Sequence, residues 1–303
     1  MRFRFLAVWL PLLALLGAAA GPVLAHSPPK QGFSTEELEP VLAALQARGF
    51  SRASLSKVFY DKRLSKIDRV IGLNAFDQES QRIYEPFLTR YALRKAERFR
   101  RRHFSRLWTT ERRFGVPMNI VIAILLVETQ FGTARLPFRV MSVFTTLAVE
   151  ASPAAVARHF ERLRAIHPEM EREFLQTRLG LKAEWALEQL AAMLTIGADN
   201  GMDVLELKGS YAGAFGVPQF LPTSYRRWGA DGNGDRRVNL DDMPDAMASI
   251  ANFLRSHGWR GDESLAKKKR AVWQYNRSPP YVEAIFAISR KLSLPSKKRR
   301  GRF

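Results

Sequence analysis

The chain has 303 residues, with 48 lysines and arginines against 29 acidic residues, so its formal net charge at pH 7 is +19. It contains no cysteine, which excludes disulfides, thiolate metal sites, cysteine nucleophiles and a lipid-modified cysteine. Hydrophobic residues make up 46% of the sequence, enough for a chain of this length to bury a sizeable core. The positive charge must therefore belong to solvated faces or to the binding of an anionic partner.

The first 25 residues combine the three parts of an export signal. Arg2 and Arg4 supply the positive end, residues 5–20 form the apolar run, and residues 23–25 provide a small-residue cleavage site. The alternative is an uncleaved membrane anchor, because the apolar run approaches the length of a short span. We favour cleavage, which leaves a chain that starts at His26 and carries no integral membrane span.

Helical patterns follow along most of the chain. Residues 34–60 predict two short helices, the first opened by the capping-box pair Ser34 and Glu37. Residues 80–113 show one long helical pattern in which arginines fill the positions between apolar residues. A solvated helix face is the favoured interpretation of these arginines, and a binding surface is the alternative. Residues 153–200 predict further helix, and no long strand pattern occurs, so we expect a mainly α fold.

Residues 114–132 contain an apolar helix that ends in an acidic side chain. Pro117 suits the first helical turn, and residues 120–127 are apolar on every side, so the helix is expected to be buried. Glu128 emerges where the apolar run ends. Because desolvation disfavours the charged form of a carboxylate, Glu128 is a candidate general acid. The alternative is a glutamate that only pairs with an arginine or caps a neighbouring helix.

The segment GSYAGAFGVPQFLPTSY, residues 209–225, combines glycines, aromatic rings and neutral hydrogen-bonding side chains. Its glycines permit close backbone approach, its rings offer flat apolar faces, and Ser210, Gln219 and Thr223 can pair with hydroxyl groups. This mixture suits a sugar ligand, and a tightly packed turn in the core is the alternative. The glycine spacing matches no phosphate-binding or dinucleotide-binding pattern.

The next segment, DGNGDRRVNLDDMPD at residues 231–245, is similar to a calcium-binding loop. Asp231, Asn233 and Asp235 occupy the first, third and fifth positions of such a loop. An arginine stands at the sixth position, where glycine is usual, and an aspartate at the twelfth, where glutamate is usual. A bound calcium ion is favoured over an Asp- and Asn-rich turn without metal.

Near the C-terminus, Tyr275, Asn276 and Tyr281 form a polar and aromatic cluster that can line a groove. In isolation the same cluster would be an ordinary loop. The five histidines are too scattered for a zinc site, and no GxSxG nucleophile elbow occurs. The sequence ends in a basic run that is typical of a frayed terminus.

In their order along the chain, these motifs resemble the lytic murein transglycosylase B family. The order is GVP with VET and FG, then GS.AGA.G..QF.P.SY, then VNL, then ANFL with HGW, and finally YN.S..Y. The motifs span residues 114–281, more than half of the expected mature chain. The resemblance implies a mainly α, lysozyme-like catalytic core with an additional helical domain and little β-structure. The implied division is an N-terminal helical region at 26–110, the lysozyme-like region at 111–293 and a basic tail at 294–303.

The resemblance also implies a periplasmic enzyme that acts on peptidoglycan glycan strands, alongside cell-wall synthesis or remodelling proteins. Such enzymes cleave the β-1,4 bond between N-acetylmuramic acid and N-acetylglucosamine and form 1,6-anhydromuramoyl ends. Glu128 would first protonate the glycosidic oxygen and then, as carboxylate, deprotonate the C6 hydroxyl of the substrate. That hydroxyl replaces the second carboxylate of ordinary glycosidases. No cofactor is required for this chemistry.

The other functional positions of the family match residues of this chain one by one. Saccharide-binding positions correspond to Ser210, Gln219, Phe220, Tyr275, Asn276 and Tyr281. Ligand positions for a structural calcium ion correspond to Asp231, Asn233, Asp235 and Asp245, with Arg237 contributing its main-chain carbonyl. The chain departs from the family pattern after the catalytic helix, where it lacks an adjacent arginine pair.

Other functions account for parts of the sequence. A hydrolytic muramidase would cleave the same bond with addition of water. A noncatalytic protein would bind the cell wall, with Glu128 in a structural role. The net charge alone would suit a nucleic-acid-binding protein, but the export signal and the lack of a recognisable nucleic-acid module argue against it. The charge is better matched by a wall polymer whose stem peptides carry carboxylates.

Overall fold

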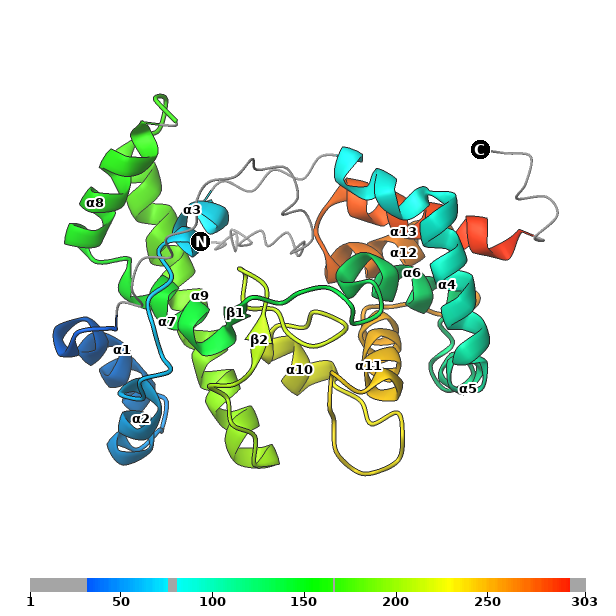
Figure 1. Cartoon of the computed structure of the whole chain (residues 1–303), viewed down its shortest axis with the longest axis horizontal. Coiled ribbons are helices and arrows are strands. Elements are labelled where there is room, and N and C mark those ends of the chain that lie inside the picture. Colours follow the sequence, from blue (N-terminus) through cyan, green and yellow to red (C-terminus); the bar gives the residue numbers. More distant parts are fainter. Residues whose placement is uncertain (1–31, 76–80, 166, 295–303) are drawn as a thin grey trace, which may run out of the picture.

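The computed structural model describes residues 32–75, 81–165 and 167–294, so the expected export signal and nearly all of the basic tail lie outside the described residues. The described chain is mainly α, as the sequence predicts (Figure 1). Its helices are α1 (Thr35–Ala47), α2 (Arg52–Phe59), α3 (Arg69–Ala75), the 3₁₀ helix η1 (Gln81–Leu88), α4 (Arg90–Arg102), α5 (Phe104–Phe114), α6 (Met118–Thr129), α7 (Val140–Val149), α8 (Pro153–Arg164), α9 (Arg172–Asn200), α10 (Pro222–Trp228), α11 (Met243–Ser256), α12 (Leu265–Tyr275) and α13 (Pro279–Ser293).

The pattern at residues 80–113 predicts one long helix, and this prediction is wrong. Pro86 lies inside η1, and a proline lacks the N–H that the interior of a regular α-helix requires. Thr89 then caps α4 by accepting a hydrogen bond from the amide of Ala92. The chain breaks again at His103, between α4 and α5. By contrast, the predicted capping box at Ser34 is present at the start of α1.

The helices pack in two groups, joined through α10. The helices α1, α3 and α8 pack against α7 and α9, whereas α4, α11, α13 and η1 surround α6. Residues 120–129 of α6 are all buried, so this helix forms the centre of its group, as its apolar sequence predicts. The arrangement places the C-terminal end of α6 beside the segment that follows β2 and beside the start of α13.

A short antiparallel ladder joins β1 (Phe138–Arg139) to β2 (Lys208–Gly209). The glycine-rich segment continues from β2 through two further antiparallel bridges, from Gly209 to Phe215 and from Phe215 to Phe220. Gly213 has a φ of +78°, and a Cβ at this position would lie 2.2 Å from the ring of Phe144. A glycine is therefore required there by both conformation and space.

Within the described ranges, no single helix is both long and apolar enough to cross a membrane. The helices α7 and α8 reach those limits of length and composition only as a pair, which is bent by 101°.

Candidate active site

The carboxylate of Glu128 lies at the C-terminal end of α6, with only 1% of the residue exposed. Its Oε1 accepts a hydrogen bond of 2.6 Å from the hydroxyl of Tyr281, a fully buried residue in the first turn of α13. Ser278 caps that turn by accepting from the amide of Tyr281, and Pro279 occupies the first helical position. The local sequence thus determines where α13 begins. This start brings the hydroxyl of Tyr281 within hydrogen-bond distance of Glu128.

A second tyrosine extends this contact toward the glycine-rich segment. The rings of Tyr275 and Tyr281 are stacked, with centroids 6.4 Å apart and an interplanar angle of 6°. The hydroxyl of Tyr275 donates to the carbonyl of Pro218 at 2.6 Å. Burial raises the pKa of both phenols well above its ordinary value, and the negative charge of Glu128 raises it further. Both phenols are therefore protonated hydrogen-bond donors at neutral pH.

The residue after the carboxylate ties α6 to the same segment. The hydroxyl of Thr129 donates to the carbonyl of Val217 at 2.8 Å and accepts from the amide of Gly132 at 2.9 Å. Directly after α6, Gln130 and Phe131 have positive φ values of 50° and 66°. This conformation is uncommon for residues other than glycine. The turn after Glu128 is thus held by one buried hydroxyl.

The predicted saccharide-binding residues lie on the segments that these hydrogen bonds join. Gln219 is buried with its backbone at a φ of +52°, and its Nε2 donates to the carbonyl of Gly216 at 2.9 Å. The Oε1 of Gln219 has no hydrogen-bond partner within the described part of the chain. Phe220 packs against Tyr275, with 5.8 Å between ring centroids. The structure therefore brings Gln219, Phe220 and the two tyrosines to one region beside α6.

Two further predicted residues shape the backbone of this region. The Oγ of Ser210 accepts hydrogen bonds from the amides of Ala212 and Ala214, at 3.3 and 3.2 Å. Asn276 is buried and caps the C-terminal end of α12. The contact of either residue with a sugar stays a prediction. In these positions Ser210 stabilises the glycine-rich loop, whereas Asn276 donates its backbone amide to the carbonyl of Val272 at 3.3 Å.

The acidic segment forms a tight loop in which side chains bind main-chain amides. The carboxylate of Asp231 accepts hydrogen bonds from the amides of Asn233, Gly234 and Arg236. These bonds, led by that of Gly234, lower the pKa of Asp231. Arg236 has a φ of +67°, so the sixth position of the loop keeps the left-handed conformation that usually requires glycine there.

The donor atoms of this loop suit a hard cation only in part. Asn233 Nδ2 donates to Oδ2 of Asp235 and of Asp242, which brings the third, fifth and twelfth positions together. Asp245 is fully buried, and its two oxygens accept from the amides of Gly232 and Asn239. No cluster of three His, Cys, Asp or Glu side chains arranged to hold a metal occurs among the described residues. Asp245 therefore supports the loop, and its predicted role as a calcium ligand, like that of Arg237, stays a prediction.

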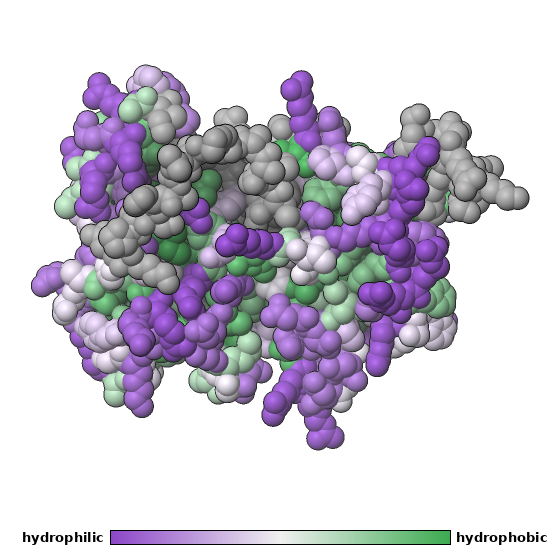
Figure 2. All heavy atoms as spheres, viewed as in Figure 1, coloured by the Kyte–Doolittle hydropathy of each residue, from purple (hydrophilic) through white to green (hydrophobic). Residues whose placement is uncertain are grey.

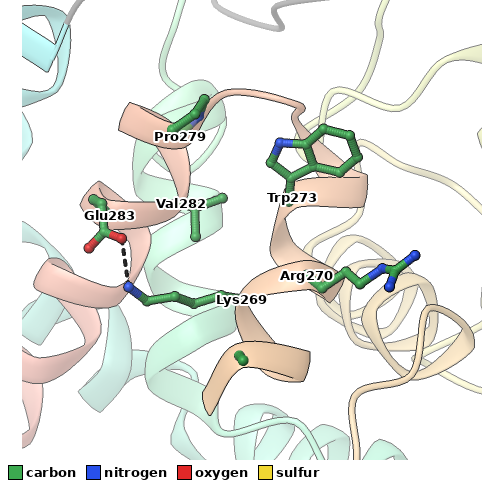
Figure 3. Close-up of a pocket in the computed structure, with 7 residues that line it drawn as sticks. Lys269, Arg270, Trp273, Pro279, Val282 and Glu283 are labelled. Carbon is green, nitrogen blue, oxygen red and sulfur yellow. Dashed lines mark hydrogen bonds and ion pairs between the residues drawn. The ribbon is translucent and has the colours of Figure 1, made fainter. Parts of the chain in front are cut away.

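A hollow of about 330 Å³ lies between α12 and α13, the two helices that carry Tyr275 and Tyr281 (Figure 3). Trp273, Pro279 and Val282 provide its apolar lining. At its edge, the Nζ of Lys269 lies 2.6 Å from Oε1 of Glu283, which links the two helices across the hollow.

Two residues of this region were not identified from the sequence. The ring of Tyr84, in η1, packs edge-on against Tyr281 with 6.0 Å between centroids. Lys95, in α4, donates to the hydroxyl of Thr133 at 2.9 Å, in the turn that follows Glu128. Burial lowers the pKa of Lys95, and the positive charge of Arg98 lowers it further. Both residues belong to the 80–113 pattern, in which no local signal separates them from their neighbours.

Comparison with known proteins identifies related chains. Residues 33–270 match the family described as Transglycosylase SLT domain. The membrane-bound lytic murein transglycosylase B of Escherichia coli K12 is 32% identical over 151 residues, which are 50% of this chain and 34% of that protein. Most of the length of that relative therefore lies outside the match.

Two solved structures share the fold. Soluble lytic transglycosylase SltB1 from Pseudomonas aeruginosa superposes with a TM-score of 0.68 at 22% identity, over 87% of this chain and all of that one. Slt35 from E. coli, solved in complex with calcium, also gives a TM-score of 0.68, at 20% identity over 89% of this chain and 97% of that one. The predicted lysozyme-like, mainly α architecture is thereby confirmed.

Proposed function

Because the chain belongs to the family of transglycosylases with an SLT domain, we propose that it is a peptidoglycan lytic transglycosylase with Glu128 as its catalytic residue. The observation that carries the proposal is the buried Glu128 carboxylate, which a protonated phenol holds at 2.6 Å. A carboxyl group in such a position can give a proton to a glycosidic oxygen and take one back.

The proposed reaction cleaves the β-1,4 bond between N-acetylmuramic acid and N-acetylglucosamine in two proton transfers. Glu128 first protonates the oxygen of the bond, so that the N-acetylglucosamine side leaves as an alcohol. The resulting carboxylate then takes the proton of the C6 hydroxyl of the muramoyl residue, whose oxygen bonds to C1. The product is a 1,6-anhydro ring, and Glu128 ends the cycle protonated as it began.

The saccharide is proposed to lie along the glycine-rich segment and the start of α13. The half-buried ring of Tyr275 would offer an apolar face to a sugar ring, and the buried ring of Phe220 would support Tyr275 from behind. We propose that the Oε1 of Gln219, buried without a partner in the described residues, accepts a hydrogen bond from an acetamido N–H. Such a bond would offset the cost of a buried acceptor that has no partner. We assign Ser210, Asn276 and Tyr281 to the same subsites.

The test is a mass analysis of the products released from purified peptidoglycan. We expect the wild-type protein to release anhydro-ended fragments and Glu128→Gln to release none, with an unchanged melting temperature. The matched control is Glu173→Gln, an exposed glutamate in the first turn of α9, which should keep full turnover. Comparable release by Glu128→Gln would remove Glu128 from the mechanism.

The same experiment separates the alternatives. Fragments heavier by one water would identify a hydrolytic muramidase. A wild-type protein that binds peptidoglycan but releases nothing would be a noncatalytic wall-binding protein.

We propose in addition that the 231–245 loop binds a structural calcium ion. Asp231, Asn233, Asp235 and the carbonyl of Arg237 would supply oxygen atoms. Asp242, at the twelfth position, is joined to this group by a hydrogen bond from Asn233. The ion would neutralise the crowded carboxylates and would take no part in the reaction. We also propose a periplasmic location, on the basis of the export signal that the sequence predicts, and cell fractionation tests it.

A further inference from the structure

The outward faces of α4 and α5 form a surface that the proposed reaction does not use. Hydrophilic side chains gather over these two helices at the right of the view in Figure 2. We define the α4–α5 surface by its exposed residues Tyr91, Arg94, Arg98, Arg101, Phe104 and Trp108. Opposite faces of the same helices are buried against α6, α11 and α13.

This surface carries a large unbalanced positive charge. From residue 90 to residue 114 the sequence contains ten lysines and arginines and two glutamates. Within the described part of the chain, one of these arginines, Arg100, pairs with Glu97. Five others form no ion pair there, namely Arg94, Arg98, Arg101, Arg102 and Arg106. Like charges held this close repel one another, so the arrangement favours an external anionic partner.

Three large aromatic side chains stand outward among these arginines. Tyr91 is 71% exposed, Phe104 55% and Trp108 51%. Phe104 and Trp108 are four residues apart on α5 and share one stripe with Arg112, whose guanidinium lies 5.6 Å from the Trp108 ring. A helix that buries one face and presents rings and arginines on the other is typical of a binding surface.

The surface is also hollowed where the two helices meet. Arg100, Arg101, Phe104 and Met118 line a depression of about 530 Å³. Two guanidinium groups beside an apolar floor suit a ligand that joins an anionic group to an apolar body.

We propose that the α4–α5 surface docks the protein on a bilayer that contains anionic phospholipids. Arginines bind phosphate groups while their aliphatic stems lie along apolar surface, and aromatic rings favour the level of the lipid headgroups. The depression at Arg101 would receive one headgroup. A soluble polyanion would be attracted by the arginines but would not need three exposed rings, and this difference favours a bilayer.

The test measures binding of the full chain to phosphatidylcholine vesicles, with and without phosphatidylglycerol, by co-sedimentation at low salt. One variant, R94Q/R98Q/R101Q, removes charge, and another, F104S/W108S, removes rings. Matched controls are R162Q/R164Q/R172Q on α8 and α9, which removes the same charge elsewhere, and F174S, which removes an exposed ring from α9. Residues 1–25 are the same in all variants, so a difference in vesicle binding between variants arises from the substituted helices.

We expect wild type to bind vesicles with phosphatidylglycerol at least about tenfold more strongly than vesicles without it. Each surface variant should lose most of this difference, and each control should keep it. Equal losses in the surface and control variants would attribute binding to net charge and overturn the proposal. It would also be overturned if only the arginine variant lost vesicle binding while retention on purified peptidoglycan fell in parallel, because the surface would then serve a polyanion. These outcomes are independent of turnover, which the four variants are expected to keep.

Discussion

The hydroxyl of Tyr281 donates a hydrogen bond of 2.6 Å to Oε1 of Glu128, across 153 positions of the sequence. The bond fixes the orientation of a carboxylate that must first give and then accept a proton at one place. It also supplies a charge-assisted bond to the ionised form, which exists midway through the proposed reaction.

Tyr281→Phe is therefore expected to lower kcat by a larger factor than it raises KM. A hydrogen bond to a charged group is worth about 1.5–3 kcal/mol, so the loss should be about ten- to a hundredfold. Steady-state release of soluble fragments from peptidoglycan gives both constants. Tyr60→Phe, at an exposed hydroxyl far along the chain, is the control and should be neutral. A variant with normal kcat would leave Tyr281 only a packing role.

Thr129 is a positioning residue because its hydroxyl joins the turn after Glu128 to the carbonyl of Val217. Thr129→Val keeps the shape but leaves a buried carbonyl and the amide of Gly132 without this partner. We expect a loss of about 1–3 kcal/mol in the free energy of unfolding, measured by urea titration, together with a lower kcat. Thr129→Ser restores the hydroxyl and should recover most of both. If serine rescued stability but not kcat, the hydroxyl would not position Glu128.

Some of this site follows from local sequence. The burial of α6 follows from its apolar residues on every side, and the turn at Asp231 follows from Asp and Asn side chains that bind amides two to five residues ahead. Both depend on interactions within one segment. The apolar helix alone left open whether Glu128 is a catalytic acid or a structural residue. The order of the motifs along the chain favoured the catalytic acid.

Other features depend on contacts that no local pattern contains. The break at His103 divides a run whose apolar spacing continues on both sides. Helices from both sides of the expected boundary at residue 110 pack on α6. The helices α7 and α9, which lie after this boundary, pack with α1 and α3, which lie before it. We therefore propose that the N-terminal helices and residues 140–200 form one unit and the remainder forms the other. The order of the helices along the sequence does not reveal that residues 140–200 pack with the N-terminal helices.

Calcium is expected to stabilise the folded chain through the 231–245 loop. If the ion binds the native state alone, a hundredfold excess over Kd adds about 2.7 kcal/mol, which should raise Tm by about 4–5 °C in a chain of this length. Differential scanning calorimetry with added calcium, and with a chelator, measures the shift. D231N/D235N should lose it, and Asp262→Asn, at an exposed site, should keep it. An equal Tm with calcium and with chelator in the wild type would exclude an occupied loop.

A buried ion cluster at the end of α7 predicts a loss of stability in acid. Oε2 of Glu150 accepts from Arg158 at 2.6 Å and from Nε2 of His159 at 2.8 Å. The Nζ of Lys66 lies 3.4 Å from Oε1. Burial by itself raises the pKa of Glu150, but the His159 hydrogen bond and the positive charges around the carboxylate outweigh it and lower the pKa to about 2.

A carboxyl group whose folded pKa lies below its ordinary value of 4.5 stabilises the native state above that value. The contribution of Glu150 should therefore be complete at neutral pH and decline as the pH falls from 4.5 toward about 2. Glu150→Gln should cost about 1–3 kcal/mol at neutral pH, the usual loss for a hydrogen-bonded charged group, because Arg158 is 58% exposed and Lys66 keeps its ion pair with Glu37. It should also make stability less dependent on pH across this window. Urea unfolding at neutral pH and at about pH 3 measures both effects, with Glu173→Gln as control. If Glu150→Gln lost as much stability in acid as the wild type, the acid sensitivity would arise at other carboxylates.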